Sequence, residues 1–389
     1  MESKLAQTGA EPAPVTALDE APREPPFDHP DLPAIGGHIG PQPEDFVVDE
    51  VPLYTCSGQG DHWFVRLRKR EATTLELRAA VAAAAGVAAG DIGYAGMKDK
   101  HAVTTQWLSV PVPRARPPEA WVLPAAFELL EVTRHNNKLR LGHLAANRFR
   151  IRLVQLSAGA SEGLRAFFAR LEAQGIINFF GAQRFGRNSG NLQGALFALR
   201  RGRLGPRAGT RGKFMASVIQ SEVFNRYATA RMALGRERLL AGDVVRFSDG
   251  RAMFTVEEPE REQARLDRGE LRLTGPMVGP KMKLSGGLPR QLEQDALASL
   301  GLDAAALSAL GRWAPGTRRD LVLWPRELAV EAADAAEAAG LGAARSLTVA
   351  FELPAGAYAS LVVRTLTRQD PWLGASGAES GGDDTEGEA

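Results

Sequence analysis

The sequence predicts a mixed α/β (α+β) protein with two domains, because three features of the chain agree. Its 389 residues, of which 44% are hydrophobic, suffice for two ordinary domains with apolar cores. The segment 147–153 (NRFRIRL) alternates apolar and charged side chains, as a half-buried strand does. Leu164, Phe167, Phe168 and Leu171 recur at the spacing of one helix face and are expected in a core. The chain therefore combines strands with helices.

Both ends of the chain are predicted to be disordered. Residues 1–35 contain seven prolines and few bulky apolar side chains, so they bury too little surface to offset their ordering entropy. Residues 373–389 are rich in glycine, serine and acidic side chains. The folded part is expected between these segments.

The first half of the chain predicts strands and helices in alternation. We expect a strand beginning at 46–48, a hairpin partner for it at 62–68, a helix over 74–85 that ends at Gly86, a strand over 107–112, short strands at 127–132 and 138–144, and a helix that is capped by Ser161 and ends at Gly175. In the hairpin partner, Trp63, Val65 and Leu67 share one face, opposite Arg66 and Arg68.

The second half begins after a domain boundary predicted near residue 177. We expect a structured loop over 178–193, a helix over 214–234, a strand entered at 242–245, turns at 274–277 and 279–280, helices over 288–300 and 304–310, and a strand over 321–324. A last strand over 347–353 leads through a proline- and glycine-containing turn into a helix over 359–366.

Composition excludes several classes of protein. No apolar run approaches the roughly 18 residues of a membrane span, and the N-terminus lacks a signal-like segment. Cys56 is the single cysteine, and the six histidines show no metal-ligand spacing. We therefore expect a cytoplasmic monomer that needs neither a membrane, a metal nor a cofactor.

The distribution of charge favours a nucleic-acid partner more than the net charge of +1 does. Two windows lack Asp and Glu: residues 132–161, with six lysines or arginines, and residues 173–221, with eight. Clustered cations without carboxylates create a positive field that suits phosphate backbones. The alternative is that both windows are ordinary solvated basic surfaces.

The segment 94–110 (YAGMKDKHAVTTQWLSV) contains the candidate catalytic residue. Asp99 lies between Lys98 and Lys100, after a small-residue turn and before a strand-like run. By composition alone, an aspartate between two lysines is most often a solvated turn residue.

The whole string G-x-K-D-x-x-A-x-T-x-Q over 96–106 resembles the signature of the TruD family of tRNA pseudouridine synthases. Four further stretches are similar to that family and occur in its order: PEDF at 43–46, HNNKLRLGHLAANRF at 135–149, NFFGAQRFG at 178–186 and FELPAGAY at 351–358. Together the stretches cover most of residues 43–366.

The resemblance implies both a fold and a reaction. It implies a discontinuous pseudouridine synthase domain (36–177 and 324–372), built on a mixed, largely antiparallel sheet, and an inserted α/β TRUD domain (178–323). The implied activity is the isomerisation of uridine 13 in tRNA to pseudouridine. By the same resemblance Asp99 is the nucleophile, Phe46, Asn147 and Phe351 contact the substrate, and Phe149 lies next to the target base.

One position departs from the family pattern. Members often carry Lys or Arg three residues before the proline of PEDF, near the catalytic carboxylate, whereas this chain has Gly40. His38 and Lys98 are the candidates for the missing cation, and Lys98 is also a candidate substrate contact.

Other interpretations of these residues remain. Phe46 and Phe351 lie in strand-like runs and are also typical of a core, and Asn147 is also typical of a turn before a strand. The charge pattern alone also fits a non-catalytic RNA-binding or RNA-folding protein, and Asp99 alone also fits a hydrolase that releases free uracil.

Overall fold

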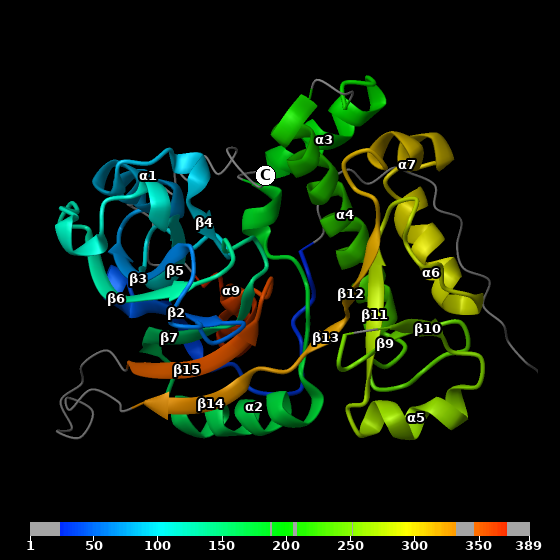
Figure 1. Cartoon of the computed structure of the whole chain (residues 1–389). Helices are drawn as coiled ribbons and strands as arrows, with labels where there is room; N and C mark the ends of the chain where they lie inside the picture. Colours follow the sequence, from blue (N-terminus) through cyan, green and yellow to red (C-terminus); the bar gives the residue numbers. More distant parts are fainter. Residues whose placement is uncertain (1–23, 187–188, 205–207, 251, 332–345, 372–389) are drawn as a thin grey trace, which may run out of the picture. The chain divides into compact units, whose positions relative to one another are not determined.

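The computed structural model describes residues 24–186, 189–204, 208–250, 252–331 and 346–371. These residues divide into two compact units (Figure 1). The described residues of Phe27–Asn178 and Val322–Asp383 form the first, here called the split unit. Phe179–Leu321 belong to the second, here called the continuous unit. The predicted disordered tail at 373–389 lies outside the described residues.

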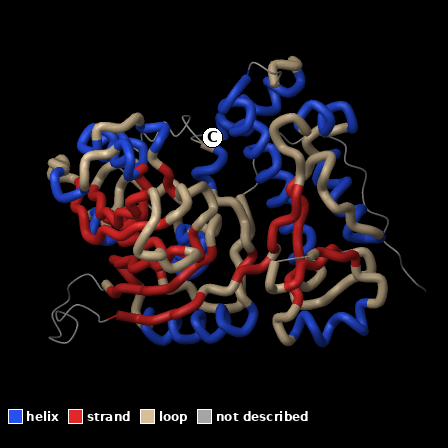
Figure 2. The backbone as a smooth tube through the Cα atoms, viewed as in Figure 1, coloured by secondary structure: helices blue, strands red, loops and turns tan. Residues whose placement is uncertain are grey.

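One large sheet organises the split unit (Figure 2). Its strands follow the order β14-β15-β7-β2-β5-β3-β6, while β1 also pairs with β7 and β4 with β5. The bounds are β1 Gly36–Ile39, β2 Phe46–Pro52, β3 His62–Arg70, β4 Gly93–Tyr94, β5 Val103–Pro111, β6 Phe127–His135, β7 Leu144–Leu156, β14 Arg326–Glu331 and β15 Leu347–Pro354. Among the described strands, β2 and β5 form the parallel pair, and the other pairs of this sheet are antiparallel. The prediction of a mixed, largely antiparallel sheet is confirmed.

Strand β7 shows why the alternating sequence forms this sheet. Phe149, Ile151 and Leu153 are buried on one face, as predicted. β15 pairs with β7 along its whole length, opposing Phe351 to Phe149 and Val349 to Ile151. Because directly opposed residues of an antiparallel pair share a face, the two strands present one continuous apolar surface.

Helices cover this apolar face in two patches (Figure 1). α1 (Thr74–Ala85) packs Leu77 and Val81 against Val65 and Leu67 of β3. α2 (Ala160–Gln174) and α9 (Ala359–Thr367) pack against β7 and β15 in a second hydrophobic cluster.

The observed ends of α1 and α2 can be compared with the helix ends predicted from the sequence. α1 begins after Thr73, which forms a capping box with Glu76, and ends at Gly86 with φ of 74°. α2 ends at Gly175 as predicted but begins after Gly159, so the prediction of Ser161 as its cap was wrong. Ser161 lies within the first turn of the helix instead.

Three further predictions about strands were wrong. β3 does not form a hairpin with β2; it lies between β5 and β6, and β2 lies between β5 and β7. Alternation identifies the faces of a strand but not its partner. Residues 138–143 form a loop before β7. The predicted turn at 274–277 is the second half of β11 (Leu271–Met277).

Pro276 is tolerated in β11 because that half of the strand is paired on one side only. β9 (Val244–Phe247) pairs with 271–273, whereas β12 (Thr317–Asp320) pairs with 274–277. A proline without an N–H group fits a strand where no second neighbour needs its hydrogen bond.

The predicted disordered leader extends too far, because residues 24–35 are part of the structure. Asp28 and His29 are buried. The Asp28 carboxylate accepts the N–H of Ile177 (2.7 Å), and the His29 ring contacts the carbonyl oxygen of Gly175 (2.8 Å). These polar contacts order the segment, so its low apolar content was a misleading guide. Residues 1–23 lie outside the described part.

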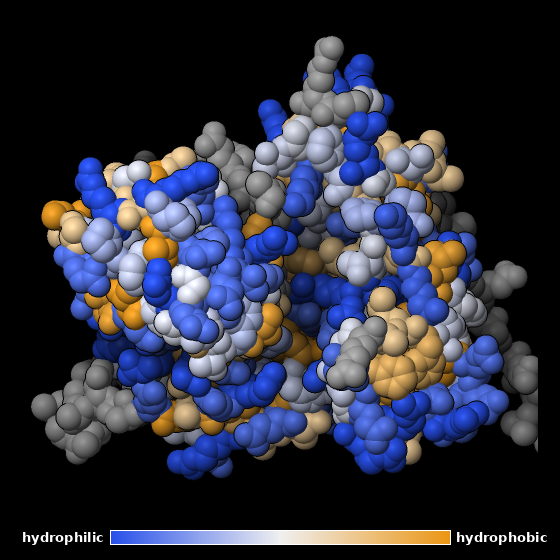
Figure 3. Space-filling view, in the orientation of Figure 1, coloured by the Kyte–Doolittle hydropathy of each residue, from blue (hydrophilic) through white to orange (hydrophobic). Residues whose placement is uncertain are grey.

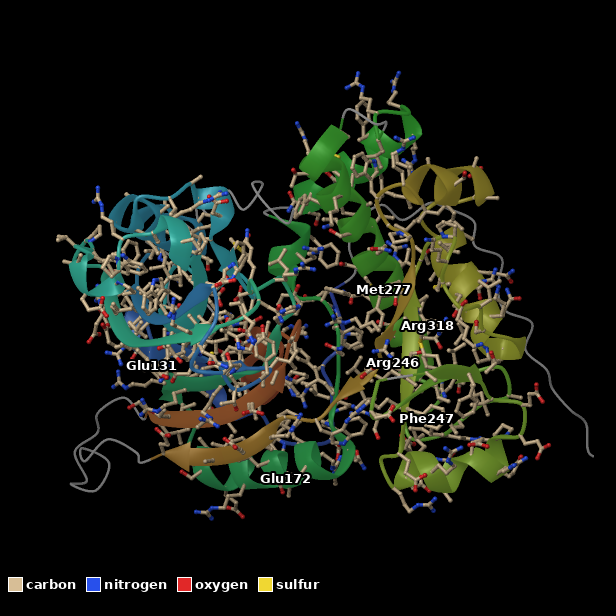
Figure 4. All side chains as sticks on the ribbon, viewed as in Figure 1. Glu131, Glu172, Arg246, Phe247, Met277 and Arg318 are labelled. Atoms are coloured by element: carbon tan, nitrogen blue, oxygen red, sulfur yellow. The ribbon has the colours of Figure 1, made fainter. Side chains whose placement is uncertain are left out.

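The continuous unit packs helices against a smaller sheet of order β10-β9-β11-β12, with β10 at Met253–Thr255. Its helices are α3 Gly190–Arg200, α4 Gly209–Met232, α5 Pro259–Asp267, α6 Gly287–Ala298 and α7 Ala304–Leu310. Arg318 of β12 is buried and forms an ion pair of 2.5 Å with Glu293 of α6 (Figure 4). Its guanidinium also donates to the hydroxyl and carbonyl oxygens of Thr274. No helix of the described residues is long and apolar enough to cross a membrane.

We expect Asp28→Ala to lower the free energy of unfolding by about 1–3 kcal/mol, because it leaves the buried N–H of Ile177 without its acceptor. Urea unfolding followed by tryptophan fluorescence measures this loss. Asp31→Ala is the matched control, since the Asp31–Arg170 pair is exposed and should contribute little. Equal losses in the two variants would contradict the assigned role of Asp28.

Candidate active site

Asp99 lies on the loop that connects β4 to β5, and its side chain is exposed. The residue before it, Lys98, is buried. The loop enters β5 through Ala102, which belongs to the same buried cluster as Phe46 and Phe149. One end of the Asp99 loop is thus embedded in the core, while Asp99 itself remains accessible.

A buried ion pair fixes the loop on the side of Lys98. The Lys98 ammonium lies 2.6 Å from Oε2 of Glu50 on β2, and both side chains are almost fully buried. The other oxygen of Glu50 accepts the backbone N–H of Trp107 on β5 (3.1 Å). One carboxylate therefore joins the loop to two strands of the sheet.

The first turn of α1 fixes the same loop. The hydroxyl of Thr74 accepts the backbone N–H of Lys98 (3.0 Å) and donates to Oε1 of Gln106 on β5 (2.9 Å). The backbone next to Asp99 is thereby bound to helix and sheet together.

A second buried lysine, Lys69 of β3, fixes the loop at Asp99 itself. Its ammonium donates to the carbonyl oxygens of Asp99 (2.6 Å) and Ala72 (2.5 Å). Burial lowers the pKa of Lys69 to about 8, and the negative charge of Asp99 opposes part of that shift. Lys69 is thus a cation that interacts electrostatically with the candidate nucleophile.

The sequence interpretation missed Lys69, although a signal was present. Trp63, Val65 and Leu67 were placed on one face of their strand, and Lys69 continues that face two residues further on. A lysine in line with apolar side chains at this position is completely buried. It was overlooked because it stands in a run of exposed basic residues.

The two cations proposed from sequence make contacts with other residues. The ammonium of Lys98 is paired with Glu50. His38 of β1 pairs with Val154, five residues along β7 from Phe149, which is roughly 16 Å of strand. Gly40 has no room for a side chain, since a Cβ there would lie 2.2 Å from Oδ2 of Asp45.

The strand register places the remaining predicted residues in three adjacent rows on one face of the sheet, and Phe46 lies in the outer row, opposite Ile151. Lys69, Thr104, Val48, Phe149 and Phe351 form one row across β3, β5, β2, β7 and β15. In the next row, Asn147 lies opposite Glu50 on one side and Leu353 on the other. The sheet therefore brings Asn147 and Phe149 to the same face as Lys69 and as Glu50, the partner of Lys98.

The three phenylalanines form an aromatic cluster. The ring centroid of Phe149 lies 6.1 Å from that of Phe46 and 5.6 Å from that of Phe351. All three side chains are buried in the core cluster of the split unit. They are core residues in this structure, as the alternative interpretation expected, and they border the polar row of Asn147.

Three buried polar atoms in these rows have no hydrogen-bond partner among the described residues. They are Oγ1 of Thr104, Nε2 of Gln106 and Oδ1 of Asn147. Buried polar groups are normally paired, so such atoms call for an explanation. They lie where the cluster under α1 meets the cluster under α2 and α9. Together they offer donors and acceptors to a polar ring or a ribose.

Nothing in this arrangement suggests a resident metal. Among the described residues, no three His, Cys, Asp or Glu side chains come close enough to hold an ion. The site combines the exposed side chain of Asp99 with the buried ammonium of Lys69, which donates to the backbone carbonyl oxygen of Asp99.

Comparison with known proteins gives a consistent set of similarities. The family model "tRNA pseudouridine synthase D (TruD)" matches residues 29–196 and 213–366. The tRNA pseudouridine synthase D of Anaeromyxobacter dehalogenans (strain 2CP-C) is 42% identical over 361 residues, 90% of this chain and 98% of that protein. A tRNA pseudouridine synthase D of Thermus thermophilus is 34% identical over 370 residues, 94% and 98% of the respective chains.

A solved structure shares the fold. The crystal structure assigned to tRNA pseudouridine synthase D from Methanosarcina mazei has a TM-score of 0.66 at 22% identity. It covers 88% of this chain and 95% of its own.

The pKa of Lys69 predicts a pH dependence of stability. Its value in the folded protein, about 8, lies below the 10.5 of an ordinary lysine, so between these values the unfolded chain binds more protons than the folded one. We expect the free energy of unfolding to gain on the order of 2–3 kcal/mol from Lys69 as the pH rises from 8 to 10.5. Lys69→Met should lack this gain in urea unfolding at each pH, and parallel curves for the two proteins would refute the assignment.

Proposed function

Because this chain belongs to the TruD family of tRNA pseudouridine synthases, we propose that it isomerises uridine 13 of tRNA to pseudouridine with Asp99 as the nucleophile. The chain is an isomerase, and the proposal assigns its target position and its reacting group. The observation that carries it is an exposed carboxylate on a backbone that two buried lysines hold in place.

Pseudouridine formation requires a nucleophile, and this site contains a carboxylate that can serve as one. Pseudouridine formation breaks the N-glycosidic bond, turns the uracil and rejoins it to the ribose through carbon, so substrate and product have the same atoms. A carboxylate can hold one fragment covalently while the other turns. The positive charge of Lys69 favours the ionised form of Asp99, which is the nucleophilic form.

The face beside Asp99 is suited to hold the base. The target uridine has to leave its stack to reach a carboxylate, and an aromatic face offers a replacement contact. Phe149 is buried in the aromatic cluster with Phe46 and Phe351, and we propose that the base packs at the border of this cluster, next to the polar row of Asn147. Asn147 supplies an unpaired acceptor in the adjacent row, which suits the N–H of uracil or a ribose hydroxyl.

We propose that the two units correspond to the two domains that the family resemblance implies. We assign the split unit, which contains Asp99, to the catalytic pseudouridine synthase domain and the continuous unit to the TRUD domain. The compactness of each unit supports this assignment. The proposal further takes the protein to act on cytoplasmic tRNA as a monomer.

Asp99→Asn tests the nucleophile, because it preserves the shape of the side chain and removes its charge. We expect at least about a thousandfold loss of pseudouridine formation at position 13, with tRNA binding retained. Chemical mapping of pseudouridine in tRNA incubated with each protein measures this. Asp61→Ala, an exposed loop aspartate, is the control and should remain active. Modification at another position only, or an active Asp99→Asn enzyme, would refute the proposal.

Asn147→Ala separates binding of the substrate from folding. The variant should lower kcat/KM for tRNA about 10- to 100-fold, because the substrate loses a hydrogen bond. Its free energy of unfolding should not fall, since Oδ1 of Asn147 has no partner among the described residues. A stability loss that matches the activity loss would show that Asn147 serves the fold alone.

A further inference from the structure

The continuous unit exposes an aromatic side chain on helix α3. Phe197 is 52% exposed, whereas its neighbours Leu196 and Ala198 are buried against the unit. Phenylalanine is usually buried in a folded protein, so one that projects from a helix is a candidate for a contact with another molecule. Much of the surface over α3 is coloured as hydrophilic in Figure 3.

Two arginines that follow α3 lie against this ring. The guanidinium carbons of Arg201 and Arg203 are 5.4 Å and 5.7 Å from the centroid of Phe197. Both arginines are exposed. Phe197, Arg201 and Arg203, here called the α3 platform, therefore join one flat apolar ring to two planar cations.

The charges of the platform are not neutralised by carboxylates within the described residues. Neither Arg201 nor Arg203 forms an ion pair there, and residues 173–221 contain no Asp or Glu. A positive surface of this kind attracts phosphate groups.

Three arginines of the other acid-free window are paired with carboxylates, unlike the two arginines of the platform within the described part of the chain. Arg148, Arg150 and Arg152 of β7 pair with carboxylates from other segments: Glu327 and Glu352, Glu331, and Asp45, respectively. An acid-free stretch of sequence therefore does not by itself leave its arginines without carboxylate partners, whereas Arg201 and Arg203 form no ion pair among the described residues.

We propose that the α3 platform binds an unpaired nucleotide of the tRNA substrate, with Phe197 stacking on the base and Arg201 and Arg203 contacting phosphates. The choice of RNA follows from the combination of an exposed ring with free cations, which is how proteins hold single-stranded nucleic acid. The inference rests on the proposed function, since that function supplies the RNA.

Binding of tRNA by platform variants tests this inference. The double variant Arg201→Gln/Arg203→Gln should weaken binding and lower the salt slope of the affinity by about 0.7–0.9 per lost phosphate contact. Phe197→Ala should weaken binding about five- to a hundredfold without changing that slope, and Phe197→Trp should restore binding. Fluorescence anisotropy over a range of salt concentrations measures both quantities.

The same unit offers matched controls. Arg265→Gln/Arg268→Gln changes the net charge equally, but both of these arginines already pair with Glu270. Leu284→Ala removes another exposed apolar side chain, 56% exposed. Both controls should bind tRNA like the wild type. Equal weakening in the control and platform charge variants would show an effect of net charge alone and overturn the inference.

Steady-state kinetics of pseudouridine formation distinguish a failure of this inference from a failure of the proposed function. Platform variants should raise KM for tRNA and leave kcat unchanged. Wild-type protein that binds tRNA through the platform but forms no pseudouridine would refute the proposed function and support the platform. Platform variants that bind tRNA as tightly as the wild type would refute the binding role of the α3 platform, whether or not Asp99 is the nucleophile. A platform that binds an acidic protein in place of RNA would also refute it.

Discussion

The buried ion pair between Lys98 and Glu50 is the interaction on which the candidate site depends. Each charge would be costly to bury alone, so each requires the other. Glu50 also accepts a backbone hydrogen bond from β5 and lies opposite Asn147 on β7. A single carboxylate thus sets the position of the residue before Asp99 relative to the strands that carry the polar row. The precision of the site comes from the sheet, although Asp99 itself lies on a loop.

The two buried lysines have different tasks. Lys98 neutralises Glu50 and attaches the loop to β2. Lys69 holds the carbonyl oxygens of Ala72 and Asp99, and its charge acts on Asp99. The carboxylate of Asp45 occupies the space beside Gly40, where a Cβ would lie 2.2 Å from its Oδ2 atom.

Local patterns predicted elements well and their partners poorly. The helix over 74–85 was predicted to the residue because its glycine stop is chemically distinct. The strand over 147–153 was recognised because period-two alternation reports a half-buried strand. The position of β2 between β5 and β7 depends on contacts between distant segments, which alternation does not encode. Asp99 was singled out by its motif, whereas Lys69 was missed because it stands among basic residues, although it continues the apolar face of β3.

The split of one unit around the other has a consequence during synthesis on the ribosome. β7 ends at Leu156, and β15, its partner along one whole edge, begins about 190 residues later at Leu347. At about 5–20 residues per second, the strand that completes this edge emerges roughly 10–40 s after β7. During that interval β7 is an edge strand with unpaired backbone groups. Arg148 and Arg150 on its outer face, whose acidic partners on β14 and β15 have not yet been made, then keep the nascent edge charged and discourage pairing with other chains.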